Sequence, residues 1–217
     1  MSVLLFEDFT KLYKRWNGGE LRKENKYEFV DLGLPSGTLW ATCNVGSSDI
    51  LDPGGFFAWG ELKEKDVYSE ETYNYDKKYL HKDFAKSLIG SDCGIPTKED
   101  FEELYKYCSM KQINNYNDSG NNVVVFTPKN CRKKNKPTLI FPLSGYKMTS
   151  TVPVFGYKPM TNTLRMEGDV TLLWTINYSK EFGKATCIKI GLIDMEIKNI
   201  HTYWGCNLRP IKNKESQ

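Results

Sequence analysis

The sequence predicts an α+β domain in which many short strands accompany few helices. Two observations carry this prediction. From Tyr27 onward, short apolar and β-branched runs alternate with turns that contain Gly, Pro or Asn. Only one segment inside this part of the chain shows the apolar spacing of a helix. A chain of 217 residues suits one such domain with an appendage, and its 13% aromatic content fits both a β-sheet core and a binding surface.

The chain begins with a segment that is predicted to form a helix over residues 2–16. Ser2 can cap this helix, and Asn17-Gly18-Gly19 ends it. Its apolar stripe packs either on its own domain or on a partner in a larger assembly. We therefore expect residues 1–26 to be a docking or oligomerisation segment and residues 27–217 to be the main domain. The stripe consists of Leu5, Phe9, Leu12 and Trp16.

The main domain is expected to consist of short strands and one internal helix. The helix begins after Pro96, because Thr97 and Asp100 have the spacing of a capping box and an apolar face follows them. Residues 114–121 are polar and predict a loop. The expected strands lie at 27–32, 38–43, 55–59, 122–127, 138–142, 171–177, 184–193 and 203–211.

Two connections are expected to be long surface loops that carry recognition. Residues 61–83 are polar and rich in Tyr, and residues 146–169 are rich in Gly, Thr and Met. Tyr rings stack on sugar rings or on protein side chains. The tyrosines of these two loops are therefore candidate ligand-binding residues. The alternative is that each ring packs against the base of its own loop. The candidates are Tyr68, Tyr73, Tyr75 and Tyr157.

Residues with catalytic or metal-binding chemistry are scarce. The six Cys lack CxxC spacing, so they predict reduced thiols and no structural zinc site. His81 and His201 are the only histidines, and a pair formed by His201 and Cys206 would have no third group. We therefore expect a protein that is not an enzyme and that has no metal and no cofactor.

Charge and hydropathy exclude other classes of partner. The net charge is +3, and the basic cluster between two expected strands has no interleaved aromatic residue, so nucleic-acid binding is not expected. No apolar run reaches the roughly 20 residues of a membrane span. Glu7 and Asp8 interrupt the apolar stretch that a secretory signal needs. The basic cluster comprises Lys129, Arg132, Lys133, Lys134 and Lys136.

Read in order, six motifs resemble the Fibrobacter succinogenes major paralogous domain over roughly residues 27–211. They are VDLGLPSGTLWATCNVG at 30–46, FAWGE at 57–61, PTKE at 96–99, FEEL at 101–104, IFPLSGY at 140–146 and WGCNLRPI at 204–211. The resemblance implies a C-type-lectin-like fold, similar to the formylglycine-generating-enzyme branch, with short antiparallel strands and long ordered loops.

The chemistry of these related folds is not expected here. Formylglycine-generating enzymes hold copper with two nearby cysteines, whereas the C-terminal motif offers only Cys206. The segment from Trp174 to Asn177 lacks the Asp that normally completes a lectin calcium site, so calcium-dependent sugar binding is not expected.

The resemblance and the missing signal together predict a display or recognition module on a phage virion surface, made in the cytoplasm. Its expected partners are a surface glycan or host-surface protein, other virion proteins and further copies of itself. The alternatives are a purely structural virion decoration, a bacterial surface-associated binding protein and, last, an enzyme of the formylglycine-generating type.

Overall fold

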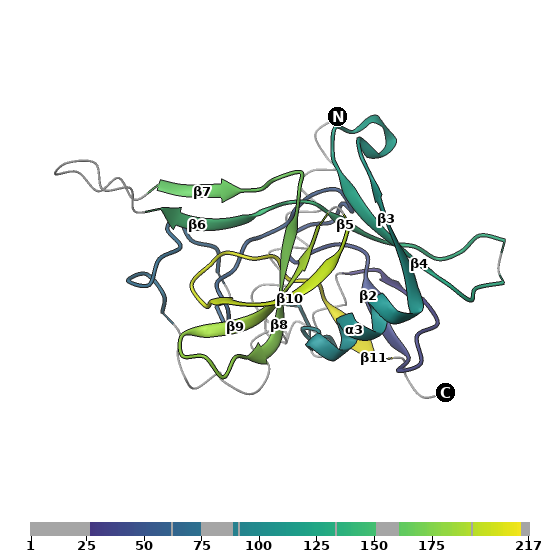
Figure 1. Cartoon of the computed structure of the whole chain (residues 1–217), viewed down its shortest axis with the longest axis horizontal. Helices are drawn as coiled ribbons and strands as arrows, with labels where there is room; N and C mark the ends of the chain where they lie inside the picture. The colour runs from purple at the N-terminus through teal and green to yellow at the C-terminus, as the bar shows by residue number, and fades with distance from the viewer. Residues whose placement is uncertain are drawn as a thin grey trace, which may run out of the picture.

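The computed structural model describes residues 27–61, 63–74, 89–90, 92–132, 134–150, 161–191 and 193–213. Within these residues the chain forms small antiparallel sheets and one α-helix of 10 residues, α3 (Figure 1). This confirms the sheet-rich α+β class. The expected helix at 2–16, with Leu5, Phe9, Leu12 and Trp16, lies outside the described residues.

Two three-stranded sheets come from segments that are close in sequence. One has the order β3-β4-β5, and the other has the order β10-β9-β8. Their strands are β3 (Cys108–Ile113), β4 (Val123–Pro128), β5 (Leu139–Pro142), β8 (Thr171–Tyr178), β9 (Lys184–Ile190) and β10 (Met195–His201). The turn between β3 and β4 contains the short helix η2 (Tyr116–Asp118), which lies in the polar loop expected at 114–121.

A third sheet joins the two ends of the described chain, in the order β1-β2-β11. These strands are β1 (Phe29–Val30), β2 (Thr38–Ala41) and β11 (Ile211–Asn213). A two-stranded ribbon, formed by β6 (Tyr146–Ser150) and β7 (Thr161–Arg165), projects to one side (Figure 1).

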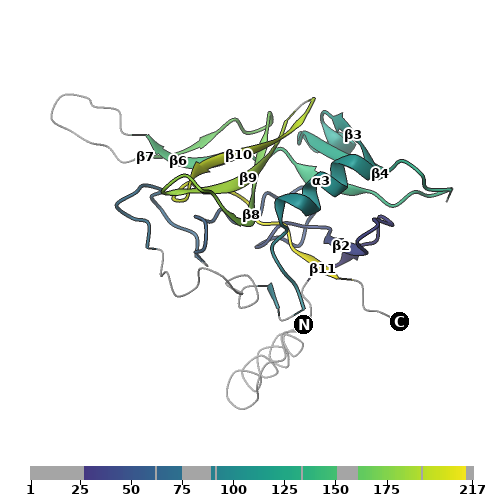
Figure 2. The same cartoon turned by 60° about the horizontal axis from the view of Figure 1, so that its bottom comes forward.

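Helix α3 (Lys98–Tyr107) begins where the sequence predicts. Thr97 accepts a hydrogen bond from the backbone NH of Asp100, and the Asp100 carboxylate accepts one from the backbone NH of Thr97. Two residues of this helix, Phe101 and Leu104, are fully buried. The helix contacts β3, β4, β8 and β9 (Figure 2). The helix ends at Tyr107, and the next residue, Cys108, already belongs to β3.

Strand β8 separates two apolar clusters, because alternate side chains of a strand point to opposite faces. Leu172 and Trp174 belong to the cluster that contains Trp59, whereas Leu173 belongs to the cluster that contains Trp40. A strand that is buried on both faces shows no alternation of apolar and polar residues, which agrees with the apolar run seen here.

Some sequence-based predictions about strands are wrong. Residues 55–59 form only a single bridge, between Phe57 and Cys206, and residues 203–211 make isolated bridges before β11 begins. Conversely, the connection at 146–169 contains β6 and β7, and β3 and β10 were not expected. The strands expected at 122–127, 138–142, 171–177 and 184–193 correspond to β4, β5, β8 and β9, and those expected at 27–32 and 38–43 shorten to β1 and β2.

The guanidinium of Arg209 is fully buried in the middle of the domain and is neutralised by no described carboxylate. Its Nε donates to Asn44 Oδ1 at 2.9 Å, and its Nη1 donates to the carbonyls of Ala41 and Thr42 at 2.9 and 2.5 Å. Its Nη2 donates to the Ile140 carbonyl at 2.9 Å. Burial lowers the pKa of Arg209 to about 9, so the group still carries its charge at neutral pH.

Replacement of this guanidinium tests its contribution to stability. We expect Arg209→Met to lower the free energy of unfolding by about 3 kcal/mol, because four buried oxygens lose their donor. Urea unfolding followed by tryptophan fluorescence measures the loss. Arg132→Met, at an exposed position, is the control and should leave the unfolding midpoint unchanged. A loss below about 1 kcal/mol for Arg209→Met would contradict the assignment.

Candidate functional site

The two described tyrosines among the predicted ligand-binding residues serve the fold. Tyr68 is fully buried, and its hydroxyl donates to the Phe56 carbonyl. Tyr73 is half-buried, and its hydroxyl donates to the Trp59 carbonyl at 2.8 Å. Both rings therefore pack against the protein itself, which is the alternative that the sequence left open. Tyr75 and Tyr157 lie outside the described residues.

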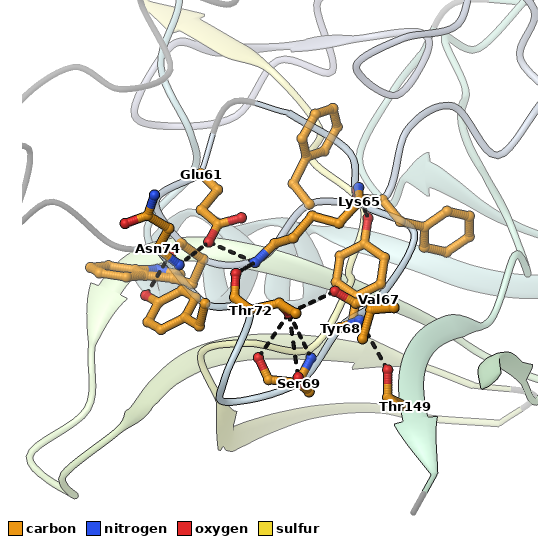
Figure 3. A network of polar contacts seen from close by, with 12 residues as sticks. Glu61, Lys65, Val67, Tyr68, Ser69, Thr72, Asn74 and Thr149 are labelled. Carbon is orange, nitrogen blue, oxygen red and sulfur yellow. Dashed lines mark hydrogen bonds and ion pairs between the residues drawn. The ribbon is translucent and has the colours of Figure 1, made fainter. Parts of the chain in front are cut away.

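The loop at 61–74 is crosslinked by its own polar groups (Figure 3). The ammonium of Lys65 pairs with Glu61 Oε1 at 2.7 Å and donates to the Thr72 carbonyl at 2.8 Å. Both charged side chains are less than 15% exposed, which shields their attraction from water. Glu61 also accepts from the backbone NH of Asn74 at 2.8 Å. These bonds hold the loop in one shape.

Tyr68 connects this loop to two other segments. Its backbone NH donates to Thr149 Oγ1 of β6 at 3.0 Å, and the Thr149 backbone NH donates back to the Tyr68 carbonyl at 3.0 Å (Figure 3). Its ring lies directly beneath Gly205, where an added Cβ would be 2.8 Å from the ring. The Tyr68 ring thus fixes the turn at 201–205 against β6.

That turn and β6 carry four aromatic rings in one continuous series. His201 stacks on Tyr203 with centroids 5.0 Å apart and lies 6.4 Å from Trp204, which in turn stacks on Tyr146 at 5.2 Å with the planes 6° apart. We name these four residues the aromatic row. His201 is exposed and the other three rings are half-buried, so the row contributes to the surface.

The charges of two carboxylates act on Tyr203, at one end of the row. Burial and then the charges of Glu70 and Glu71 raise the pKa of the Tyr203 phenol, which places both acids near that end. On the neighbouring part of β6, the Lys147 ammonium lies 4.7 Å from the centre of the Phe56 ring. Phe56 is buried, and Lys147 points to the face of β6 opposite to Tyr146, so this contact is not part of the row.

The loop at 61–74, β6 and the turn after β10 lie on the same side of the molecule in both overall views (Figures 1 and 2). Sequence reasoning missed this grouping because it assigned residues 203–211 to a strand and searched for recognition in the loops. The signal was the aromatic density of residues 201–204, followed by a glycine.

A nucleophile formed by His201 and Cys206 is not present. Cys206 is fully buried, and burial raises the pKa of its thiol well above the usual value, whereas His201 is exposed and stacks on Tyr203. The described residues also contain no group of three or more His, Cys, Asp or Glu side chains that could hold a metal ion.

The segment from Trp174 to Asn177, which lies in β8, has a structural role. Trp174 is fully buried, and its Nε1 donates to the Phe57 carbonyl at 2.8 Å. Asn177 Oδ1 accepts from the backbone NH of Lys98 at 2.8 Å, so it satisfies one of the free donors at the start of α3.

The described members of the basic cluster, Lys129, Arg132, Lys134 and Lys136, lie on the connection between β4 and β5, where the sequence placed them. Lys129 donates to the carbonyls of Tyr105 and Lys106 at 3.4 and 2.7 Å, which stabilises the C-terminal end of α3. A cavity of about 580 Å³ opens beside this connection. Its lining includes Tyr107, Cys131 and Arg132 but has no series of stacked rings like the aromatic row.

Comparison with protein-family models, with curated proteins and with solved structures found no match to this chain. No helix in the described part of the chain has the length and apolar character that a membrane crossing requires.

The thiols offer a test of this burial pattern. At pH 8 we expect a thiol reagent to modify Cys131 rapidly, because its side chain is partly exposed, and to modify all six after unfolding. Burial raises the pKa of Cys108 to about 11 and that of Cys187 to about 12, which keeps both protonated at that pH. Mass mapping of the labelled sites would contradict the structure if a buried thiol reacted as fast as Cys131. The thiols expected to be protected are Cys43, Cys93, Cys108, Cys187 and Cys206.

Proposed function

We propose that this domain is a non-enzymatic recognition module that binds a surface glycan through the aromatic row. The observation that carries the proposal is the series of four contacting rings at the surface, supported by a fully buried Tyr68. Rings with a negative face attract the polarised CH groups on the face of a sugar.

The surroundings of the row also suit a sugar. Sugar hydroxyls donate and accept hydrogen bonds, and the nearby groups include the carboxylates of Glu70 and Glu71. The supporting loop is held by its own ion pair and hydrogen bonds, so little ordering entropy is lost when a ligand binds.

We also propose that the fold is C-type-lectin-like and that the chain is related to the family that its motifs resemble. The support is that the motifs meet in space. Arg209, from the motif at 204–211, binds Ala41, Thr42 and Asn44 of the motif at 30–46 and Ile140 of the motif at 140–146. The placement on a virion surface and the oligomer remain predictions from the sequence.

A purely structural role is the second candidate, and binding measurements separate the two. We expect purified full-length protein to bind intact bacteria or their extracted surface polysaccharides saturably, and to do so equally with and without a chelator. Trp204→Ala should weaken binding about tenfold, because about 1.4 kcal/mol of stacking is lost.

Tyr105→Ala provides the matched control, since it removes an exposed ring from α3 and should leave affinity unchanged. Circular dichroism confirms that both variants are folded. Equal binding by Trp204→Ala and the unaltered protein would refute a role for the row, and absence of any binding would favour the structural candidate.

A further inference from the structure

A cationic side chain lies at the opposite end of the row from Glu70 and Glu71. Arg165 ends β7, and in the ladder it is the direct partner of Tyr146. Side chains of directly opposed residues lie on the same face of a two-stranded ribbon, with their Cβ atoms about 5 Å apart. Arg165 and Tyr146 therefore project from the same face of the ribbon, where β6 begins and β7 ends.

The donors of Arg165 are not all used by the protein. Its Nε is buried and has no hydrogen-bond partner, and no ion pair joins it to a described carboxylate. A buried donor without an acceptor is costly, and most such groups in native proteins are paired. Arg209 differs, because its Nε donates to Asn44 and its guanidinium has four acceptors in all.

The neighbouring backbone keeps Arg165 in this position. Gly145 has a positive φ of 71°, and a Cβ there would be 2.3 Å from the Arg165 carbonyl. Only glycine permits this approach of the two strands where the ribbon begins. The register that opposes Arg165 to Tyr146 is thus fixed at the base of the ribbon.

We propose that the row binds an acidic glycan and that Arg165 holds the carboxylate of a hexuronic acid residue while the face of Trp204 that Tyr146 leaves free stacks on an adjoining sugar. This inference rests on the proposed function and specifies its ligand class. A guanidinium presents parallel NH donors whose geometry matches a planar carboxylate, and such bonds are stronger than those between neutral groups.

The two ends of the row differ in sign, which sets the direction of the glycan. The charge of Glu70, which acts on the Tyr203 end, disfavours a second carboxylate there. A repeating unit with one acidic sugar and one or more neutral sugars fits this arrangement better than a uniformly charged polymer.

The experiment compares probes that differ only in charge. Full-length protein is titrated with oligosaccharides in which a hexuronic acid alternates with a neutral sugar, such as hyaluronan and heparosan oligomers, and with the same oligomers after methyl esterification. We expect at least one acid form to bind ten times more tightly than its ester, and that preference should fall as salt is added. Equal affinity for acid and ester in every pair, or no binding of any oligomer, overturns the inference.

Variants assign the preference to one side chain. Arg165→Gln should abolish the preference for the acid but leave binding of the ester intact, whereas Arg132→Gln should change neither. Trp204→Ala should weaken acid and ester alike. Loss of the ester as well as the acid in Arg165→Gln would contradict a role confined to the carboxylate.

A second readout does not depend on any ligand. Because the buried Nε of Arg165 has no partner in the free protein, Arg165→Met should leave the urea unfolding midpoint equal or raise it. A lowered midpoint would show that Arg165 is structural and would overturn the inference.

The outcomes also separate this inference from the proposed function. Strong binding of neutral bacterial polysaccharide that depends on Trp204 but not on Arg165 preserves the function and refutes the acidic ligand. Binding of polyglutamate, but of no oligosaccharide, through Arg165 would indicate an acidic peptide and refute both.

Discussion

The structure depends on a charged group that has no opposite charge. Arg209 brings a guanidinium into the core and gives its hydrogen bonds to three backbone carbonyls and one side-chain amide. Two residues earlier, Asn207 donates to the carbonyls of Pro53 and Gly55 at 3.0 Å and accepts from Ser144 at 2.6 Å. These side-chain bonds add to the isolated backbone bridges of this segment, and together they hold short sheets together that would be marginal alone.

The candidate site is a consequence of this construction. Because the segment before Arg209 is irregular, it can turn at 201–205 and present His201, Tyr203 and Trp204 next to one another. Tyr68 supports the turn from below, so a buried ring in one loop determines where exposed rings of another segment stand.

Some elements could be predicted from the residues of one short segment alone. The capping box at Thr97 and the apolar runs of β4, β5, β8 and β9 are examples. The site was not predictable in this way. Tyr68 and Trp204 are both aromatic residues in polar surroundings, and only contacts made across 81 residues, from Tyr68 to Thr149, decide which ring is buried. The ribbon of β6 and β7 was also missed, because the Gly, Thr and Met residues of 146–169 indicated a loop.

The placement of β1 and β11 has a mechanical consequence. Both strands are antiparallel to β2, so they run parallel to each other on its two sides. Tension that enters before Phe29 and leaves after Asn213 therefore pulls the outer strands in opposite directions along β2. The hydrogen bonds of the sheet then bear the load together in shear and do not open one after another.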